Sequence, residues 1–310
     1  MKRDLLSIRD LSKEEINNIL KLSAVMKHSR AEWARRPLEG KTIGMIFSKS
    51  STRTRVSFEV GIGELGGKSL FLTRNDLQLG RGETIEDTAR VLSRYLHGAV
   101  IRTYAHSDVE NFADAFDHPV INALTDSFHP CQILTDLFTI HEISGKTEGV
   151  KVAFVGDCAS NMANSMILAA EMADMSLKLS SPPEYKPDSS LMQQALNNGG
   201  NVSWTADVEE AVKDADYIYT DVWVSMGLED EKQERLKKFA PYQVNAELLG
   251  KAPAHVKILH CLPAHRGEEI TSEVIDSDAS VVFDQAENRL HVQKAIMTML
   301  TDKNWLELIK

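Results

Sequence analysis

The chain lacks the features of a secreted or membrane-bound protein. Its three cysteines, Cys131, Cys158 and Cys261, lie far apart without the spacing of metal ligands, and their odd number argues against a disulfide framework. No apolar run approaches the roughly 18 residues that span a bilayer. The first residues, MKRDLLSIRDLSKEE, are too charged for a secretory signal. We therefore expect a reduced, cytoplasmic protein that does not enter a membrane.

Positive charge is also scarce. The sequence has 35 Lys and Arg residues against 45 Asp and Glu residues, which gives a formal net charge of -10. Nucleic acids and anionic membranes attract proteins through an excess of Lys and Arg, so we expect this chain to bind neither. The stretch FSKSSTRTRVSFEVG stands out against this background, because it holds Lys49, Arg53 and Arg55 close together.

The 310 residues, 43% of them hydrophobic, suit a globular protein of about two domains. Short apolar runs alternate with longer amphipathic segments, which is typical of parallel-sheet α/β folds. We predict strands at TIGMIF, KSLFLT, GAVIRT and PVINAL, and then at VKVAFVG, MSLKLS, NVSWT, YIYTDVW, VKILHCLP and SVVF. The expected fold class is α/β, with two doubly wound parallel-sheet domains facing across a cleft.

Two long helical patterns, over residues 129–143 and 286–308, flank the second set of strands. We expect them to join a first domain over residues 1–140 to a second over residues 141–287, near the polar stretch ISGKTEG. The C-terminal helix over residues 288–310 should pack back on the first domain. The charged segment SMGLEDEKQERLKKF, by contrast, is expected to be loop-like and to close over a ligand.

Unexpected polar residues fall at or just beyond the carboxyl ends of the predicted strands. They are Ser51 to Arg55, Arg102, His129, Asn161, Asp221 and Cys261. Ligands of open α/β sheets bind at that edge, so two facing domains would bring these groups into one cleft.

The sequence STRT occupies the first turn of a helix that should begin near Thr52. Free backbone N–H groups and the positive end of the helix dipole favour an anion there. The hydroxyls of Ser51 and Thr54 and the guanidinium of Arg53 add donors that suit a phosphate. The alternative is N-capping by Ser or Thr beside solvated arginines.

Further donors follow along the chain. Arg102 ends a predicted strand, where it either contacts a ligand or forms a structural ion pair. Pro130 suits the first helical position, so His129 and Gln132 share a first turn, and His129 could be only a cap. Alternatively, a neutral imidazole and an amide could hold the carbonyl oxygen and the NH2 group of a small planar ligand.

The motifs KSSTRTRVSFE, HPCQ, DVWVSMG and HCLPAHRG, in this order, resemble the transcarbamoylase family over essentially the whole chain. The last two resemble its ornithine branch. The resemblance implies two α/β domains, with carbamoyl phosphate bound in the first and L-ornithine in the second. The implied reaction transfers the carbamoyl group to the δ-amine of ornithine and gives L-citrulline and phosphate, without a cofactor or a metal.

The resemblance also implies site residues. Those for carbamoyl phosphate are Ser51, Thr52, Arg53, Thr54, Gln78, Arg102, His129, Gln132, Cys261, Leu262 through its carbonyl, and Arg289. Those for ornithine are Asn161, Asp221, Ser225 and Met226. Gln78 resembles a residue that reaches the site of a neighbouring subunit, which implies a homotrimer. Ser160 departs from the pattern, because an asparagine is expected there.

The chemistry of the amine decides the roles of two residues. A Lys-like amine, with a pKa of about 10.4, attacks only when neutral. A carboxylate beside it would raise that pKa, so Asp221 is assigned to the α-ammonium of ornithine. Cys261 is then the neighbour of the δ-amine, unless it is a buried, inert thiol. Thr54, Arg102 and His129 are the candidate donors to the oxyanion of a tetrahedral intermediate.

Three other functions remain to be weighed. An aspartate or other amine carbamoyltransferase would share the phosphate motifs, although a second substrate carboxylate calls for cations rather than for Asp221. A dinucleotide site at VKVAFVGDCASNMANS lacks the G-x-G-x-x-G pattern. A simple phosphate-binding module would leave HCLP and Asp221 without a role.

Overall fold

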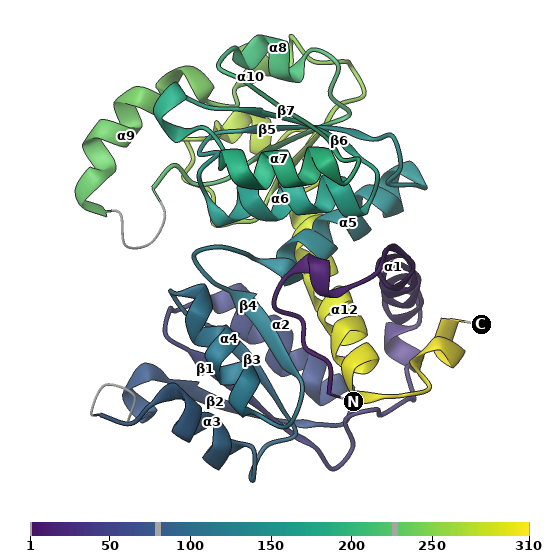
Figure 1. Cartoon of the computed structure of the whole chain (residues 1–310). Coiled ribbons are helices and arrows are strands. Elements are labelled where there is room, and N and C mark those ends of the chain that lie inside the picture. The colour runs from purple at the N-terminus through teal and green to yellow at the C-terminus, as the bar shows by residue number, and fades with distance from the viewer. Residues whose placement is uncertain (1, 78–81, 225–228, 310) are drawn as a thin grey trace. The chain divides into compact units, whose positions relative to one another are not determined.

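The computed structural model describes residues 2–77, 82–224 and 229–309, and the chain divides into two compact units (Figure 1). Unit 1 comprises residues 1–138 and 287–310, and unit 2 comprises residues 139–286. Both boundaries fall inside helices, namely α5 (Pro130–Ser144) and α12 (Val282–Thr301). The last part of the chain therefore belongs to the same compact unit as its first part.

Unit 1 is built on a four-stranded sheet in the order β2-β1-β3-β4, with all neighbours parallel. The strands are β1 (Thr42–Phe47), β2 (Lys68–Thr73), β3 (Gly98–Arg102) and β4 (Val120–Leu124). Phe47 pairs with both Thr73 and Arg102, so the carboxyl ends of three strands are level. The N-terminal segment adds a parallel bridge from Leu5 to Ile121.

Helices cover both faces of this sheet. Besides α5 and α12, the helices of unit 1 are α1 (Lys13–His28), α2 (Thr52–Glu64), α3 (Ile85–Leu92) and α4 (His106–Ala115), with short 3-10 turns at Ile8–Asp10, Arg30–Glu32, Arg74–Asp76 and Trp305–Ile309. One buried cluster joins α3 and α4 to β1, β3 and β4. On α2, Gly61 permits the close approach of α12, because a Cβ there would lie 3.2 Å from Lys294 and 3.3 Å from Met297.

Unit 2 has a five-stranded parallel sheet in the order β7-β6-β5-β8-β9. Its strands are β5 (Lys151–Val155), β6 (Ser176–Ser180), β7 (Asn201–Thr205), β8 (Tyr217–Thr220) and β9 (Lys257–His260). Its helices are α6 (Asn161–Met172), α7 (Ser189–Asn197), α8 (Val208–Val212), α9 (Lys232–Phe239), α10 (Ala246–Leu249) and α11 (Ser272–Ile275), with 3-10 turns at Pro183–Tyr185, Glu229–Glu231 and Ala240–Tyr242. In Figure 1, α6 and α7 cover one face and α8 and α10 the other. The predicted class, two doubly wound parallel α/β sheets, is confirmed.

Two predictions near the C-terminus are wrong. SVVF is not a strand, because only Ser280 forms an isolated bridge, to Ile258, and α12 already begins at Val282. The last helix ends at Thr301, and a separate 3-10 turn follows from Trp305. A short apolar run at a helix start cannot be told from a buried strand by periodicity alone, which explains the first error.

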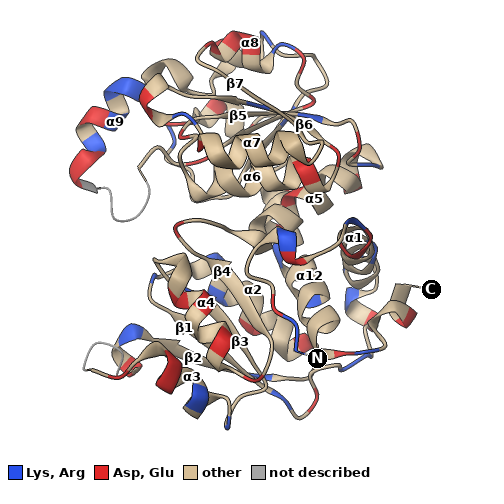
Figure 2. Ribbon diagram, in the orientation of Figure 1, with Lys and Arg blue, Asp and Glu red and all other residues tan. Residues whose placement is uncertain are grey.

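The expected loop at SMGLEDEKQERLKKF is also wrong over its described part, where residues 232–239 form α9. Figure 2 shows basic and acidic residues alternating along this helix. Ion pairs one turn apart join Glu231 to Arg235 at 2.8 Å and Glu234 to Lys238 at 2.9 Å. Such pairs favour a helix even where few apolar residues mark it. None of the helices within the described residues is long and apolar enough to cross a membrane.

One buried residue of unit 1 couples its fold to pH. The side chain of His291 on α12 is 1% exposed, and its Nε2 lies 3.8 Å from Oε1 of Glu287. Burial and the charge of Lys294 lower the pKa of His291 to about 4. The folded protein therefore favours the neutral imidazole.

We expect this group to weaken unit 1 in acid. The stability that the neutral imidazole supplies is complete above pH 6.5, the ordinary pKa of histidine, and is lost as the pH falls toward about 4. The shift corresponds to about 3 kcal/mol. In urea unfolding, His291→Gln should flatten this decline, whereas His28→Gln, at an exposed position of α1, should not. Equal slopes for both variants would contradict the assignment.

Candidate functional site

The start of α2 follows β1 at the carboxyl edge of the unit 1 sheet. Ser51 is the N-cap residue, with φ −163° and ψ 113°, and its Oγ accepts a hydrogen bond from the Thr54 backbone N–H at 3.3 Å. The N-capping interpretation is therefore confirmed for Ser51. Thr52 is exposed and Arg53 is half-buried in the same first turn. The helix thus presents its remaining N–H groups and these side chains at the sheet edge, as an anion site requires.

The second arginine of the motif has a different role. Nε of Arg55 lies 3.0 Å from Oε1 of Glu59, and its guanidinium carbon lies 3.8 Å from the ring centroid of Phe71 on β2. Arg55 is therefore held on the outer side of α2 by an ion pair and a cation–π contact. Of the two arginines in STRTR, only Arg53 remains a candidate for the site.

A buried guanidinium ties three elements of unit 1 together. Arg289 of α12 is 3% exposed. It donates from Nη2 to Oγ1 of Thr54 on α2 at 2.9 Å, and from Nη1 to Oε1 of Gln132 on α5. Gln132 in turn donates from Nε2 to Oδ1 of Asp136 at 2.8 Å. Three residues that lie far apart in the sequence are thus in direct contact, and both ends of the Gln132 amide are engaged by the protein.

Two more candidates are buried near this cluster. Arg102 ends β3 and is 6% exposed, and its carbonyl accepts the Ser48 N–H at 2.8 Å. His129 directly precedes α5 and is 5% exposed. Burial, together with the positive charges of Arg289 and Arg102, holds the pKa of His129 well below its ordinary value. The imidazole is therefore neutral near pH 7 and can donate only one N–H.

The sequence interpretation left Lys49 outside the site. Its Nζ lies 4.1 Å from the ring centroid of Tyr104, just beyond β3. Burial and the nearby charge of Arg102 lower the pKa of Lys49. Its position two residues beyond β1 was the available signal. Lys49, Arg53, Arg102 and Arg289 make this edge cationic in a chain of net charge -10.

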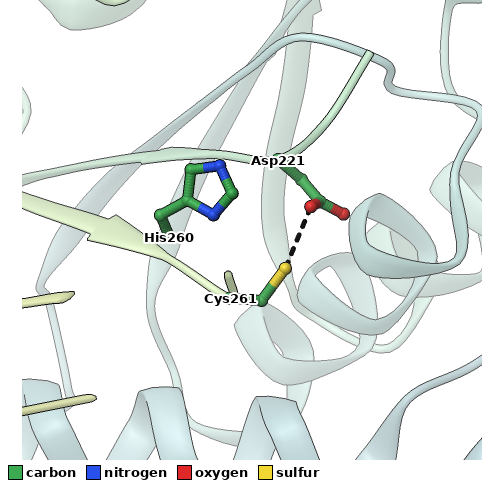
Figure 3. Close-up of side chains that lie close together, drawn as sticks. All are labelled: Asp221, His260 and Cys261. Carbon is green, nitrogen blue, oxygen red and sulfur yellow. Dashed lines mark hydrogen bonds between the residues drawn. The ribbon is translucent and has the colours of Figure 1, made fainter. Parts of the chain in front are cut away.

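In unit 2, Asp221 and Cys261 follow the neighbouring strands β8 and β9. Figure 3 shows the Cys261 thiol pointing at the Asp221 carboxylate, with His260 beside them. Sγ donates to Oδ1 at 2.9 Å, and the same oxygen accepts the Val222 N–H at 2.8 Å. Burial raises the pKa of Asp221, although these two hydrogen bonds lower it. The predicted pair is therefore assembled, and Oδ2 of Asp221 takes part in neither bond.

The β5–α6 turn carries Asn161. Asn161 is the first residue of α6, and Ser160 before it is the N-cap, with Oγ accepting the Ala163 N–H at 3.2 Å. The departure at position 160 thus has a structural role, because serine is a favoured N-cap residue.

A buried ion pair fixes α9 beside that turn. Arg235 donates from Nη1 to Oδ2 of Asp157 at 2.7 Å and to the Trp223 carbonyl at 3.0 Å. It therefore links the turn after β5 to the segment after β8, and both segments hold candidate ornithine residues. Asp157 directly follows a predicted strand, which was the signal in the sequence, but nothing there identified its partner.

The other two cysteines are unsuited to chemistry. Both are buried, whereas Cys261 is partly exposed. Burial raises the pKa of Cys131 to about 12 and also raises the pKa of Cys158. Thiolates react and thiols do not, so the inert interpretation applies to these two. Three candidates, Gln78, Ser225 and Met226, lie outside the described residues.

Two groups of side chains in unit 2 have the composition of a metal site. Asp221, His260 and Cys261 form one, and His265, Glu268 and Glu269 form the other, with candidate ligand atoms within 4.8 Å of one another. The members of both groups already bond to one another or to the backbone. Composition alone is not an argument for an ion at either place.

Comparison with known proteins gives consistent results along the chain. Residues 3–142 match the model for the carbamoyl-P binding domain of aspartate/ornithine carbamoyltransferase, and residues 148–300 match the model for its Asp/Orn binding domain. The chain is 52% identical to the ornithine carbamoyltransferase of Oceanobacillus iheyensis, over 96% of this chain and 94% of that protein. It is also 52% identical to the enzyme of that name from Bacillus subtilis, over 97% and 94% of the two chains.

Solved structures agree with these matches. The ornithine carbamoyltransferase of Pyrococcus furiosus is similar with a TM-score of 0.93 and 50% sequence identity, over 97% of this chain and 98% of that one. The enzyme of that name from Thermus thermophilus has a TM-score of 0.89 and 37% identity, over 97% and 100% of the two chains. The chain belongs to the aspartate/ornithine carbamoyltransferase family.

Proposed function

We propose that this protein transfers the carbamoyl group of carbamoyl phosphate to the δ-amine of L-ornithine, giving L-citrulline and phosphate. The observation that carries the proposal is the contact of Arg289 with Thr54 and Gln132 beside the start of α2. It supplies a dry cationic cluster at a helix N-terminus, which suits a small phosphorylated ligand. The relatives named ornithine carbamoyltransferase support the choice of amine.

Carbamoyl phosphate binds unit 1 in this proposal. The phosphate is held by Ser51, Thr52, Arg53 and Thr54 at the start of α2, where the helix dipole and charge-assisted hydrogen bonds favour a dianion. Gln132 has its oxygen on Arg289 and one N–H on Asp136, which leaves its second N–H for the ligand. These contacts also stabilise the phosphate as it leaves, because its charge grows in that step.

The carbamoyl carbonyl is the group that becomes an oxyanion. Arg102, the neutral imidazole of His129 and the Thr54 hydroxyl donate to it, and each such donor contributes a few kcal/mol in the transition state. The carbamoyl NH2 donates to the Leu262 carbonyl. The attack of the δ-amine on the carbamoyl carbon gives a tetrahedral intermediate. Its C–O bond to phosphate then breaks, and no covalent enzyme intermediate is required.

Ornithine binds unit 2 in this proposal. The contact between Asp221 and Cys261 constrains how these two residues share the substrate. Oδ1 of Asp221 holds the thiol and the Val222 N–H, so Oδ2 receives the α-ammonium. Cys261 faces the δ-amine, and Asn161 binds the α-carboxylate with Ser225 and the backbone of Met226. The acidic group disfavours aspartate as a substrate, because its second carboxylate would be repelled.

We also propose a homotrimer in which Gln78 completes the site of a neighbouring subunit. An exposed apolar surface on unit 1 supports an interface between copies. Val56 and Val60, one turn apart on α2, are 50% and 39% exposed, and Leu70 on the edge strand β2 is 44% exposed. The contact between Arg55 and Phe71 joins these two elements. An unpaired sheet edge beside apolar side chains is normally covered by a partner.

A substrate panel tests the function and the role of Asp221 together. With carbamoyl phosphate and phosphate release as the readout, we expect turnover of L-ornithine but not of L-aspartate. Asp221→Asn keeps an oxygen for the Cys261 thiol and removes the charge. It should lower kcat/KM for L-ornithine at least tenfold, about 1.4 kcal/mol, and barely change it for 5-aminovalerate, which lacks the α-ammonium. Turnover of aspartate in place of ornithine would refute the proposed substrate.

The two arginines of STRTR provide a matched test of the phosphate site. Arg53→Ala should raise the Kd for carbamoyl phosphate by roughly ten- to a hundredfold, because a charge-assisted hydrogen bond is lost. Arg55→Ala, two residues along the same helix, should leave this Kd within about twofold, since its partners are Glu59 and Phe71. Calorimetry measures both values. Equal losses in the two variants would exclude a specific role for Arg53.

Mixing of two inactive variants tests the shared site. Chains with Gln78→Ala supply an intact Asp221, and chains with Asp221→Ala supply an intact Gln78. If Gln78 acts across an interface, co-refolded mixtures should recover some activity in sites that combine both intact residues. Mass spectrometry of the intact assembly verifies mixing. Verified mixed trimers without activity would show that sites are not shared in this way.

A further inference from the structure

Three consecutive residues at the end of β9 are held by side chains of unit 2. His260, the last residue of β9, is 1% exposed, and its N–H donates to Oε1 of Gln285 at 2.9 Å. Cys261 donates its thiol to Asp221. Leu262 donates its backbone N–H to Nδ1 of the His260 ring at 2.9 Å. The turn is therefore closed on itself through the imidazole of His260.

The protonation state of this imidazole follows from its two partners. Nδ1 accepts a hydrogen bond from a backbone N–H, so it carries no proton of its own. The proton is on Nε2, which lies 3.0 Å from Oε1 of Glu269. A carboxylate in that position accepts the Nε2–H and disfavours the tautomer with the proton on Nδ1. Glu269 therefore selects the form of His260 that can hold Leu262.

Two features of this turn are unfavourable in free energy, namely the backbone of Leu262 and the buried carboxylate of Glu269. Leu262 has φ +56°, in the left-handed region that non-glycine residues rarely adopt. Glu269 is fully buried, with Oε1 accepting from His260 and from the His265 N–H, while its Oε2 has no hydrogen-bond partner in the described part of the chain. A strained residue and a half-satisfied buried carboxylate persist where the surroundings over-determine the geometry. Such combinations are typical of functional sites.

We propose that His260 and Glu269 are a positioning pair for the reaction, and this inference rests on the proposed function. Neither touches a substrate. Glu269 fixes the Nε2–H tautomer of His260, and His260 holds the Leu262 backbone. Leu262 in turn keeps the Cys261 thiol against Asp221 and its own carbonyl toward the carbamoyl NH2. The pair thus acts on catalysis through the two residues that follow His260 in the chain.

Two substitutions of His260 separate its two hydrogen bonds. In His260→Asn, the amide oxygen occupies the place of Nδ1, so the bond to the Leu262 N–H is kept and the contact with Glu269 is lost. In His260→Gln, the longer side chain reaches Glu269 and leaves the Leu262 N–H without its acceptor. The proposal predicts that His260→Asn is the more active variant, whatever the order of their stabilities.

The reactivity of Cys261 provides a readout that does not depend on activity. A thiol that donates to a carboxylate stays protonated and is slow to alkylate, because the thiolate is the nucleophile. Iodoacetamide should therefore modify Cys261 about five- to tenfold faster in His260→Gln than in the wild type, and at nearly the wild-type rate in His260→Asn. Peptide mapping distinguishes Cys261 from the buried Cys131 and Cys158. The kcat for citrulline formation should fall about tenfold in His260→Gln alone.

If the His260 variants do not fold, two substitutions of Glu269 test the same proposal. Glu269→Gln keeps an oxygen for the Nε2–H, and Glu269→Met has a similar length without an acceptor. Alkylation of Cys261 should accelerate only in Glu269→Met. Equal alkylation rates within each pair, or losses of kcat that simply follow the melting temperature, would overturn the proposal. Absence of citrulline formation in the wild type would refute the proposed function instead. The alkylation rates would still show whether His260 and Glu269 position Cys261.

Discussion

Parallel strand pairing is the constraint on which both candidate sites depend. Every strand of each sheet runs in the same direction, so the residues that follow different strands emerge at one edge. In unit 1 this edge gathers Thr54, Arg102 and His129, and in unit 2 it gathers Asp221 and Cys261. The helices that start there bring N–H groups and a positive dipole to the same edge. Parallel pairing therefore brings side chains from separate parts of the sequence to one edge.

The buried charges of unit 1 explain why the end of the chain belongs with its beginning. A guanidinium out of water is costly unless its N–H groups have partners, and α2 and α5 supply partners for both Nη groups of Arg289. Residue 289 lies within the match to the Asp/Orn binding domain, yet its contacts are with residues of the carbamoyl-P binding domain. The phosphate site proposed for unit 1 therefore depends on α12. Gly61 permits that return, because it has no Cβ to press against the side chains of Lys294 and Met297 on α12.

Strands, fold class and family were predictable because their signals are local. Nine of the predicted strands match β1 to β9, since buried parallel strands are continuous apolar runs. The failures have physical reasons. SVVF has the composition of a strand but begins a helix, and α9 is stabilised by charge pairs that apolar periodicity does not detect. Likewise, Arg53 and Arg55 look alike in the sequence. Only the three-dimensional contact with Phe71 removes Arg55 from the site, and only the backbone of Leu262 reveals what His260 holds.

The distribution of charge bears on which nitrogen of ornithine reacts. A Lys-like amine with a pKa of about 10.4 needs roughly 4 to 5 kcal/mol to reach its neutral form at pH 7. In the proposed site, the carbamoyl group that it attacks is bound by Arg102 and the neutral His129, and like charge disfavours an ammonium beside a guanidinium. The proposed contact of the α-ammonium with the Asp221 carboxylate favours its protonated form instead. If a carboxylate followed β3 in place of Arg102, it would favour the ammonium form of the reacting nitrogen instead. In the proposed mechanism, the neutral imidazole donates its N–H to the oxyanion, and the phosphate takes up the proton that the amine loses.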